Sequence, residues 1–149
     1  LKGDRCLLKL HGDASQPATY VFTEEQYRQG YGEAEIDFRL QLPKALRQVY
    51  VSHSLLFLGC SLAQDKTMDL FKQVKDEDQF IIPEHFALLA EPRKASGEID
   101  GQVKQETEDP LYKIGIRPIW YSGEDNHAML VKLLELAVEV AENRVGLGV

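Results

Sequence analysis

Two apolar stretches of this sequence end on small and polar residues that could do chemistry. The stretch LLKL is followed by His11 and Gly12, and the stretch LLFL is followed by the turn GCSL at 59–62. Histidine titrates near neutral pH and therefore suits a general base. The Ser61 hydroxyl can donate to a sugar or phosphate oxygen, and Gly59 lets the backbone approach a ligand closely. A strand-end histidine bonded to backbone and a plain strand-to-helix turn are the simpler interpretations of the two motifs.

Four apolar runs rich in branched side chains predict the strands that would hold these residues. Their near-continuous hydrophobicity, in place of strict alternation, favours parallel strands that are covered on both faces. Helical patterns separate the runs, so an α/β sheet with right-handed crossovers is expected. The predicted strands are RCLLKL at 5–10, SLLFLGC at 54–60, HFALLA at 85–90 and IRPIWY at 116–121.

Helices are predicted between and after these strands from capping signals and apolar stripes. The sequence TEEQ fits a capping box between Thr23 and Gln26. Further helices are expected at 43–53, from Asp65 onwards and from Glu124 onwards. The last of them is expected to dock on the sheet. The polar stretch 91–110 is interpreted as a solvated loop or an insertion.

Polar residues or glycines follow all four predicted strands. Ligands of open parallel sheets collect at the carboxyl ends of the strands, because loops and helix amino termini gather there. We therefore expect a binding site at this edge. The residues that would form it are His11 with Gly12, the turn 59–62, Glu91 with Pro92, and the stretch 122–126.

The composition limits the classes of partner. The chain has 149 residues, enough for one domain with one core, and its net charge is -7. That charge repels nucleic-acid backbones and anionic lipid surfaces, and no apolar run approaches the roughly 18 residues that cross a bilayer. We therefore expect a soluble, cytoplasmic protein. Cys6 and Cys60 belong to no pair at metal-ligand spacing, and both are expected to be reduced and mostly buried.

The other histidines carry weaker signals than His11. His53 precedes a predicted strand and His85 begins one, so both stand at the opposite edge of the sheet. His127 lies in the first turn of the last helix, where packed or solvated residues are common. Because no histidine or cysteine is paired at ligand spacing, a catalytic metal is not expected. A serine hydrolase is a rival interpretation, but Ser61 lacks the Gly-x-Ser-x-Gly elbow.

The order and distance of LHGD and LFLGCSL make the chain resemble the carboxyl-terminal half of sirtuin-like NAD-binding domains. It looks especially like the minimal prokaryotic type found in NAD-consuming defence proteins. The stretches YVFTEEQY, HFALLAEP and GIRPIWYSGEDNHAMLVKLLELA also resemble successive elements of that group. The resemblance implies that residues 1–149 form a single domain with a partial Rossmann-like, three-layer α/β fold. Its sheet would be mostly parallel, with about four strands.

The resemblance also implies which residues bind and act. The family's catalytic histidine, part of a His-Gly pair, matches His11, and its Gly-x-Ser-Leu turn, which contacts NAD, matches residues 59–62. The implied reaction is cleavage of the bond between nicotinamide and ribose, with NAD as substrate and His11 as general base on a ribose hydroxyl or on water. The residues implied to contact NAD are Gly12, Gly59, Cys60, Ser61, Leu62, Asp125 and Asn126, the last two beside the adenine.

Three departures from the family pattern shape these expectations. The glycine-rich first βα turn that cradles the pyrophosphate is missing, so we expect a fragment of a longer protein that binds NAD poorly alone. The four-cysteine zinc module of the protein deacylases is missing as well, which argues against deacylation. The third strand ends in Ala90 and Glu91, where many members place an asparagine against the ribose, and Glu91 could substitute as an acceptor.

These observations support hypotheses from three classes of function: an enzyme, a binding module and a structural remnant. The leading hypothesis is an NAD hydrolase domain of a larger, homo-oligomeric protein, and an NAD-dependent deacylase is a further enzymatic alternative. The second class is a module that binds NAD or ADP-ribose without turning it over. The third is a structural remnant whose exposed sheet edge pairs with another chain.

Overall fold

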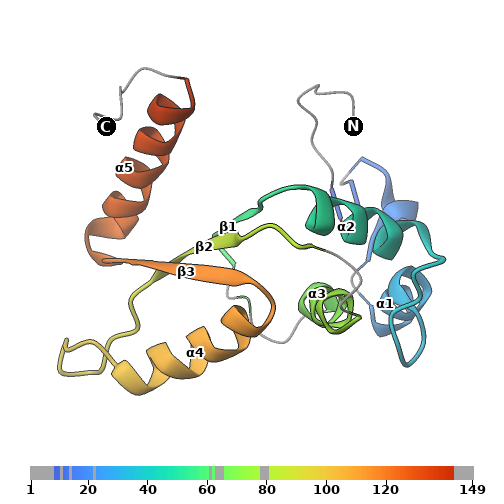
Figure 1. Ribbon diagram of the computed structural model, residues 1–149, viewed down its shortest axis with the longest axis horizontal. Helices are drawn as coiled ribbons and strands as arrows, with labels where there is room; N and C mark the ends of the chain where they lie inside the picture. The colour runs from blue at the N-terminus through green and yellow to red at the C-terminus, as the bar shows by residue number, and fades with distance from the viewer. Residues whose placement is uncertain are drawn as a thin grey trace. The chain divides into compact units, whose positions relative to one another are not determined.

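The computed structural model describes two compact units. The units are Leu1–His53 with Ala63–Ile81 (unit 1) and Ser54–Leu62 with Ile82–Val149 (unit 2). The chain therefore passes from one unit to the other three times (Figure 1). The residues that the structure describes are 9, 10, 12, 13, 15–21, 23–60, 62, 66–77 and 81–142.

Helices and strands alternate along most of the described chain, as the sequence predicts for an α/β protein. None of the helices in this described part is long and apolar enough to cross a membrane. The elements are η1 (Pro17–Thr19), α1 (Glu24–Tyr31), α2 (Gln41–Ser52), β1 (Leu56–Leu58), α3 (Lys66–Asp76), β2 (His85–Ala90), α4 (Gly101–Lys113), β3 (Ile116–Tyr121) and α5 (Glu124–Ala141).

Unit 2 is built on a parallel sheet of three described strands in the order β1-β2-β3. The register places Leu58 of β1 opposite Leu88 of β2, and Leu88 opposite Ile119 of β3. The predicted strands at 85–90 and 116–121 are confirmed in position and direction. The predicted parallel α/β architecture is therefore confirmed.

The other two predicted strands have different outcomes. The strand predicted at 54–60 is shorter, because Gly59 adopts a positive φ of 63° directly after Leu58 and leaves the extended conformation. The strand predicted at 5–10 lies mostly outside the described residues, and its last two residues, Lys9 and Leu10, are not in a strand.

The stretch predicted to be a loop at 91–110 is a helix from residue 101 onwards, so that part of the prediction is wrong. Asp100 begins α4, because its carboxylate accepts hydrogen bonds from the backbone N–H groups of Gln102 and Val103, both at 3.2 Å. The helix buries only Leu111. Its apolar stripe is therefore too sparse to stand out in the sequence.

The helix α4 covers one face of the sheet through Trp120 of β3. The Trp120 indole N–H donates to the Glu108 carboxylate, and the Lys104 ammonium lies 5.3 Å from the centre of the Trp120 ring. Successive side chains of a strand point to opposite faces. Ile119 therefore lies on the face opposite α4.

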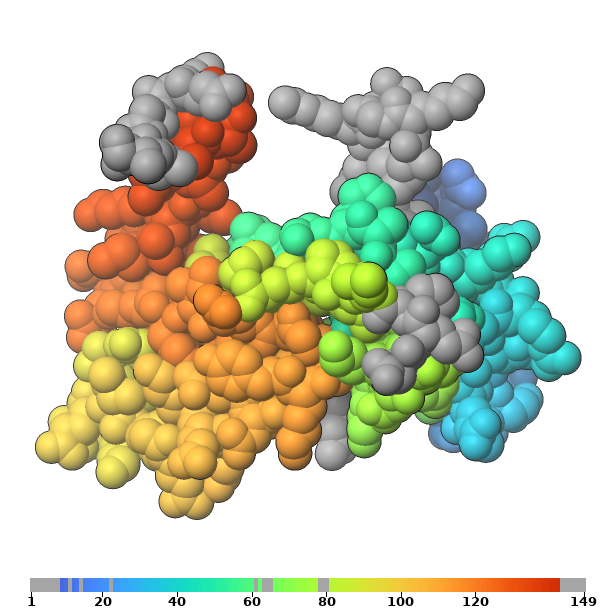
Figure 2. Space-filling view, viewed as in Figure 1, coloured from blue at the N-terminus to red at the C-terminus, as the bar shows by residue number. Residues whose placement is uncertain are grey.

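The last helix, α5, does not dock on the sheet as the sequence predicts. None of its residues, all of which the structure describes, is buried. Three successive residues in its first turn have a left-handed backbone, with φ of 49° at Asp125, 52° at Asn126 and 62° at His127. The right-handed part of α5 therefore starts at Ala128, and Figures 1 and 2 show it projecting away from the strands of unit 2.

Unit 1 packs α1, α2 and α3 around an aromatic core. Tyr50 of α2 stacks on Phe71 of α3 with ring centroids 4.2 Å apart, and Tyr31 of α1 is buried. Burial raises the pKa of Tyr50 to about 12, because the ionised phenol would lose its hydration. The predicted capping box is confirmed, since the side chains of Thr23 and Gln26 each accept a hydrogen bond from the other's backbone N–H.

Candidate functional site

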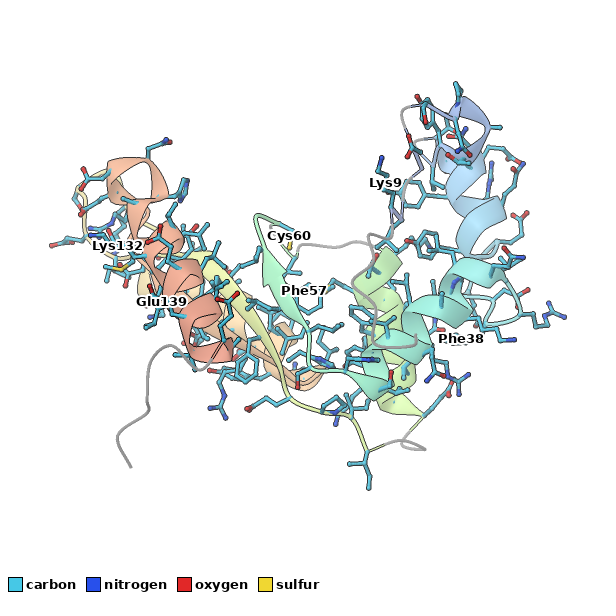
Figure 3. The ribbon with its side chains drawn as sticks, turned by 90° about the horizontal axis from the view of Figure 1, so that it is seen from above. Lys9, Phe38, Phe57, Cys60, Lys132 and Glu139 are labelled. Carbon is cyan, nitrogen blue, oxygen red and sulfur yellow. The ribbon has the colours of Figure 1, made fainter. Side chains whose placement is uncertain are left out.

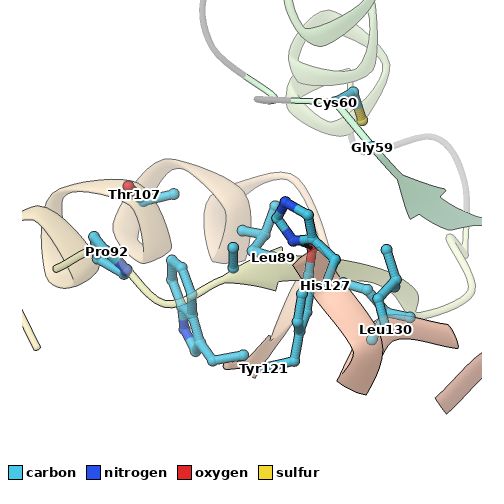
Figure 4. A pocket seen from close by; sticks show the side chains of 11 residues that line it. Gly59, Cys60, Leu89, Pro92, Thr107, Tyr121, His127 and Leu130 are labelled. Atoms are coloured by element: carbon cyan, nitrogen blue, oxygen red, sulfur yellow. Dashed lines mark hydrogen bonds between the residues drawn. The ribbon is translucent and has the colours of Figure 1, made fainter. Parts of the chain in front are cut away.

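A pocket opens in unit 2 at the carboxyl end of the sheet, the edge where the sequence predicts a ligand. Its volume is about 520 Å³, within the usual range of small-molecule sites. The walls come from the ends of the strands, from α4 and from the start of α5 (Figure 4). The lining residues are Gly59, Cys60, Leu88, Leu89, Ala90, Pro92, Thr107, Trp120, Tyr121, His127 and Leu130.

Tyr121 and His127 form a polar pair in this pocket (Figure 4). The Tyr121 hydroxyl lies 3.1 Å from Nδ1 of His127, and the two rings meet edge to face with centroids 5.8 Å apart. The turn between β3 and α5 is tight, because a Cβ on Gly123 would lie 3.4 Å from the Cβ of Ala90 and 3.7 Å from His127. This turn brings the histidine back over the end of its own strand.

The described lining suits a flat ring better than a charged group. Most of its side chains are apolar or aromatic, and the described lining residues include no lysine, arginine, aspartate or glutamate. Phosphate groups would depend on backbone N–H groups there, such as those near Gly59. Among the described residues, no group of three or more His, Cys, Asp or Glu side chains could hold a metal ion.

Arg93 connects the loop after β2 to the start of α5. Its Nη2 lies 3.5 Å from Oε2 of Glu91 and 3.4 Å from Oε1 of Glu124, and its Nη1 donates to the Gly97 carbonyl at 2.8 Å. Partly exposed ion pairs of this kind contribute at most about 1 kcal/mol each. Glu91, the residue expected to accept from a ribose, is therefore already engaged by a cation.

The structure brings some of the predicted site residues to the pocket and leaves others away from it. Gly59 and Cys60 line it, and Cys60 is exposed, so the prediction that it is mostly buried is wrong (Figure 3). Asp125 and Asn126 are exposed, lie in the left-handed turn and are not among the lining residues. Leu62 has a positive φ of 48°, which is rare for leucine and has no signal in the sequence.

His11 and Ser61, on which the predicted chemistry depends, lie outside the described residues. Gly12 is described in unit 1, where it has a φ of 97° and where a Cβ would collide with the carbonyl oxygen of Thr19. The glycine of the His-Gly pair is therefore required by a close approach of two backbone segments, whatever the histidine does.

The three described histidines lie in different surroundings. His85 is buried, its Nδ1 accepts from the Leu55 backbone N–H at 3.1 Å, and burial lowers its pKa. His53 ends α2, with Nδ1 2.7 Å from the Ser52 hydroxyl. His127 lines the pocket, and its place in the first turn of the helix that follows the strand at 116–121 is the sequence signal for this position.

Comparison with known proteins assigns a family to the chain. The model of the SIR2-like domain family matches residues 1–119. This range includes the His-Gly pair, the GCSL turn and most of the parallel sheet. The sequence matches none of the curated proteins with which it was compared. The family match covers most of the sequence, and the chain therefore belongs to the SIR2-like domain family.

Proposed function

We propose that this chain contributes to a site that hydrolyses NAD by cleaving the bond between nicotinamide and ribose. The observation that carries the proposal is the SIR2-like family match over residues 1–119, a range that contains His11 and Ser61. The pocket at the carboxyl end of the described sheet supports it, because nucleotides bind at this edge of open α/β sheets.

The proposed chemistry needs one base and no acid. NAD supplies a bond from the ribose C1′ to a cationic nicotinamide, which leaves with the bonding electron pair as a neutral molecule. The neutral imidazole of His11 takes the proton from the water whose oxygen bonds to C1′, and later releases that proton to solvent. A general base of this kind contributes roughly 10²- to 10⁴-fold to the rate.

The other proposed roles concern binding. The Ser61 hydroxyl and the backbone near Gly59 are proposed to hold the ribose and the phosphates, and Gly12, Cys60 and Leu62 are proposed as further residues that contact NAD. Asp125 and Asn126 are proposed near the adenine. The apolar and aromatic surface of the described pocket supports the binding of a flat ring at this end of the site.

The decisive experiment measures nicotinamide release by the full native protein and by its His11→Ala variant. We expect a loss of at least about 100-fold in turnover, with an unchanged unfolding midpoint. His53→Ala is the matched control, because His53 is exposed at the end of α2 and should leave turnover unaffected. Undiminished turnover in the His11→Ala variant would refute the proposed role.

A second candidate is a module that binds NAD or ADP-ribose without turning it over. The described residues that line the pocket favour this candidate, because they offer an apolar and aromatic surface for a flat ring and include no charged side chain. The single tryptophan of the chain, Trp120, lines the pocket, so its fluorescence reports on occupancy. Quenching by both ligands with no nicotinamide release would identify a binding module, whereas release would identify the enzyme.

A further inference from the structure

One arginine of unit 2 joins three separate segments beside the pocket. Nη2 of Arg93 lies 3.5 Å from Oε2 of Glu91 and 3.4 Å from Oε1 of Glu124, while its Nη1 donates to the Gly97 carbonyl at 2.8 Å. Glu91 is the first residue after β2, and Glu124 is the first residue of α5. The guanidinium therefore ties the end of a strand to the start of the helix that carries His127.

The backbone that carries this arginine is itself fixed to the sheet. Arg93 forms an isolated antiparallel bridge with Ile99, so its loop doubles back on itself. The Glu91 N–H donates to the Tyr121 carbonyl at 2.9 Å, which holds the start of this loop against the end of β3. The Arg93 side chain therefore extends from a backbone that is anchored on both sides.

The segment that Arg93 contacts has an unfavourable backbone conformation. Residues 125–127 have φ of 49°, 52° and 62°, and none of them is glycine. Residues with a Cβ adopt this left-handed conformation in succession only where surrounding contacts hold it. The contact of Arg93 with Glu124 lies just before this run, and the contact of the Tyr121 hydroxyl with Nδ1 of His127, at 3.1 Å, lies at its end.

We propose that Arg93 is a positioning residue for the pocket of unit 2. Pro92, directly before Arg93, lines the pocket, as do His127 and Leu130 of α5. By holding Glu124, the guanidinium keeps His127 and Leu130 in place before a ligand enters, so less conformational entropy is lost on binding. This inference rests on the proposed function, because it takes this pocket as a place where part of NAD or ADP-ribose binds.

The first test needs no ligand and follows the ring signals of His127 by NMR in the full native protein. His127→Gln assigns these signals by removing them. Arg93→Ala should shift or broaden them and should speed hydrogen exchange of the amides at 125–127. The matched control is Arg117→Ala, which removes another exposed arginine, paired with Glu84 at 2.6 Å at the amino end of the sheet. It should leave the His127 signals unchanged.

The second test measures binding of ADP-ribose and of adenosine through Trp120 emission. Arg93→Ala should raise the Kd of both ligands by about threefold to tenfold, since two partly exposed ion pairs are lost. Arg117→Ala should change either Kd by about twofold at most. Adenosine carries no charge, so a loss confined to ADP-ribose would mean that Arg93 attracts the phosphates directly, and would overturn the positioning role.

Turnover of NAD gives a further readout of the same role. Arg93→Ala should raise KM for nicotinamide release and leave kcat within about twofold, because the arginine acts on the wall of the pocket and not on the reacting bond. A native protein that binds both ligands but releases no nicotinamide would refute the proposed reaction alone. The NMR and binding tests of Arg93 would keep their meaning in that case.

A double-mutant cycle tests whether Arg93 acts through Glu124. Glu124→Gln alone should weaken adenosine binding, and adding it to Arg93→Ala should cause no further loss, because both substitutions remove the same contact. Unchanged His127 signals in Arg93→Ala, unchanged adenosine affinity in that variant, or fully additive losses in the double variant would each overturn the proposal.

Discussion

At Gly12 the chain approaches itself so closely that no side chain fits. A Cβ there would collide with the Thr19 carbonyl oxygen, and the φ of 97° is strained for any other residue. Gly12→Ala should lower the free energy of unfolding by about 1–3 kcal/mol, measured by urea denaturation. Gly30→Ala is the control, because nothing lies within 4 Å of its added Cβ in α1, and it should stabilise by about 0.5–1 kcal/mol. Equal effects of the two substitutions would contradict the structure.

His85 should make stability depend on pH. Burial lowers its pKa from 6.5 in the folded state, so the unfolded chain binds more protons when the pH falls below about 6.5. Above about pH 6.5 the His85 ring is neutral in both states and the folded state keeps its full stability. Below that pH the free energy of unfolding decreases, because the unfolded chain takes up a proton that the buried ring resists. Urea denaturation at about pH 7.5, 6.5 and 5.5 should show this decrease.

Two variants separate His85 from the other histidines. His85→Asn keeps an acceptor for the Leu55 N–H but cannot take up a proton, so it should flatten the decrease below about pH 6.5. The His53→Ala variant, changed at an exposed site, should still show the decrease in stability below about pH 6.5. A decrease that persists unchanged in His85→Asn would assign the effect to other groups.

At the scale of elements, α4 depends on its cap more than on an apolar stripe. Asp100 accepts from two backbone N–H groups at the helix start, and the helix buries only Leu111. Asp100→Ala should therefore cost about 0.5–2 kcal/mol of stability. Because α4 holds Trp120 through Glu108, the same change should alter Trp120 emission. Asp109→Ala, at an exposed position within α4, is the control and should change neither readout.

At the scale of the whole molecule, we propose that the two units unfold together as one domain. The strand β1 belongs to unit 2 but continues at both ends into unit 1, and the chain passes between the units three times. Leu70 of α3 is fully buried in unit 1, so Leu70→Ala should cost about 2–5 kcal/mol. Circular dichroism and Trp120 emission should shift to the same lower midpoint. A shift seen by circular dichroism alone would mean that the units unfold independently.

The amino-acid sequence by itself determined the features that neighbouring residues encode. The capping box at Thr23, the strands at 85–90 and 116–121 and their parallel pairing follow from local patterns of apolar and capping residues, and the structure confirms them. The family also follows from short motifs, because the order of His-Gly and GCSL is a property of the sequence. The roles of His11 and Ser61 remain predictions, because both residues lie outside the described part of the chain.

Only the tertiary structure decided what fills the space around the sheet. The helix α4 carries too few apolar residues to be recognised in the sequence, and its place depends on the contact between Trp120 and Glu108. The direction of α5 depends on three left-handed residues whose types are compatible with an ordinary helix start. The pairing of His127 with Tyr121 follows from that turn. These features depend on contacts between separate elements and on backbone angles, which the periodicity of a single segment does not record.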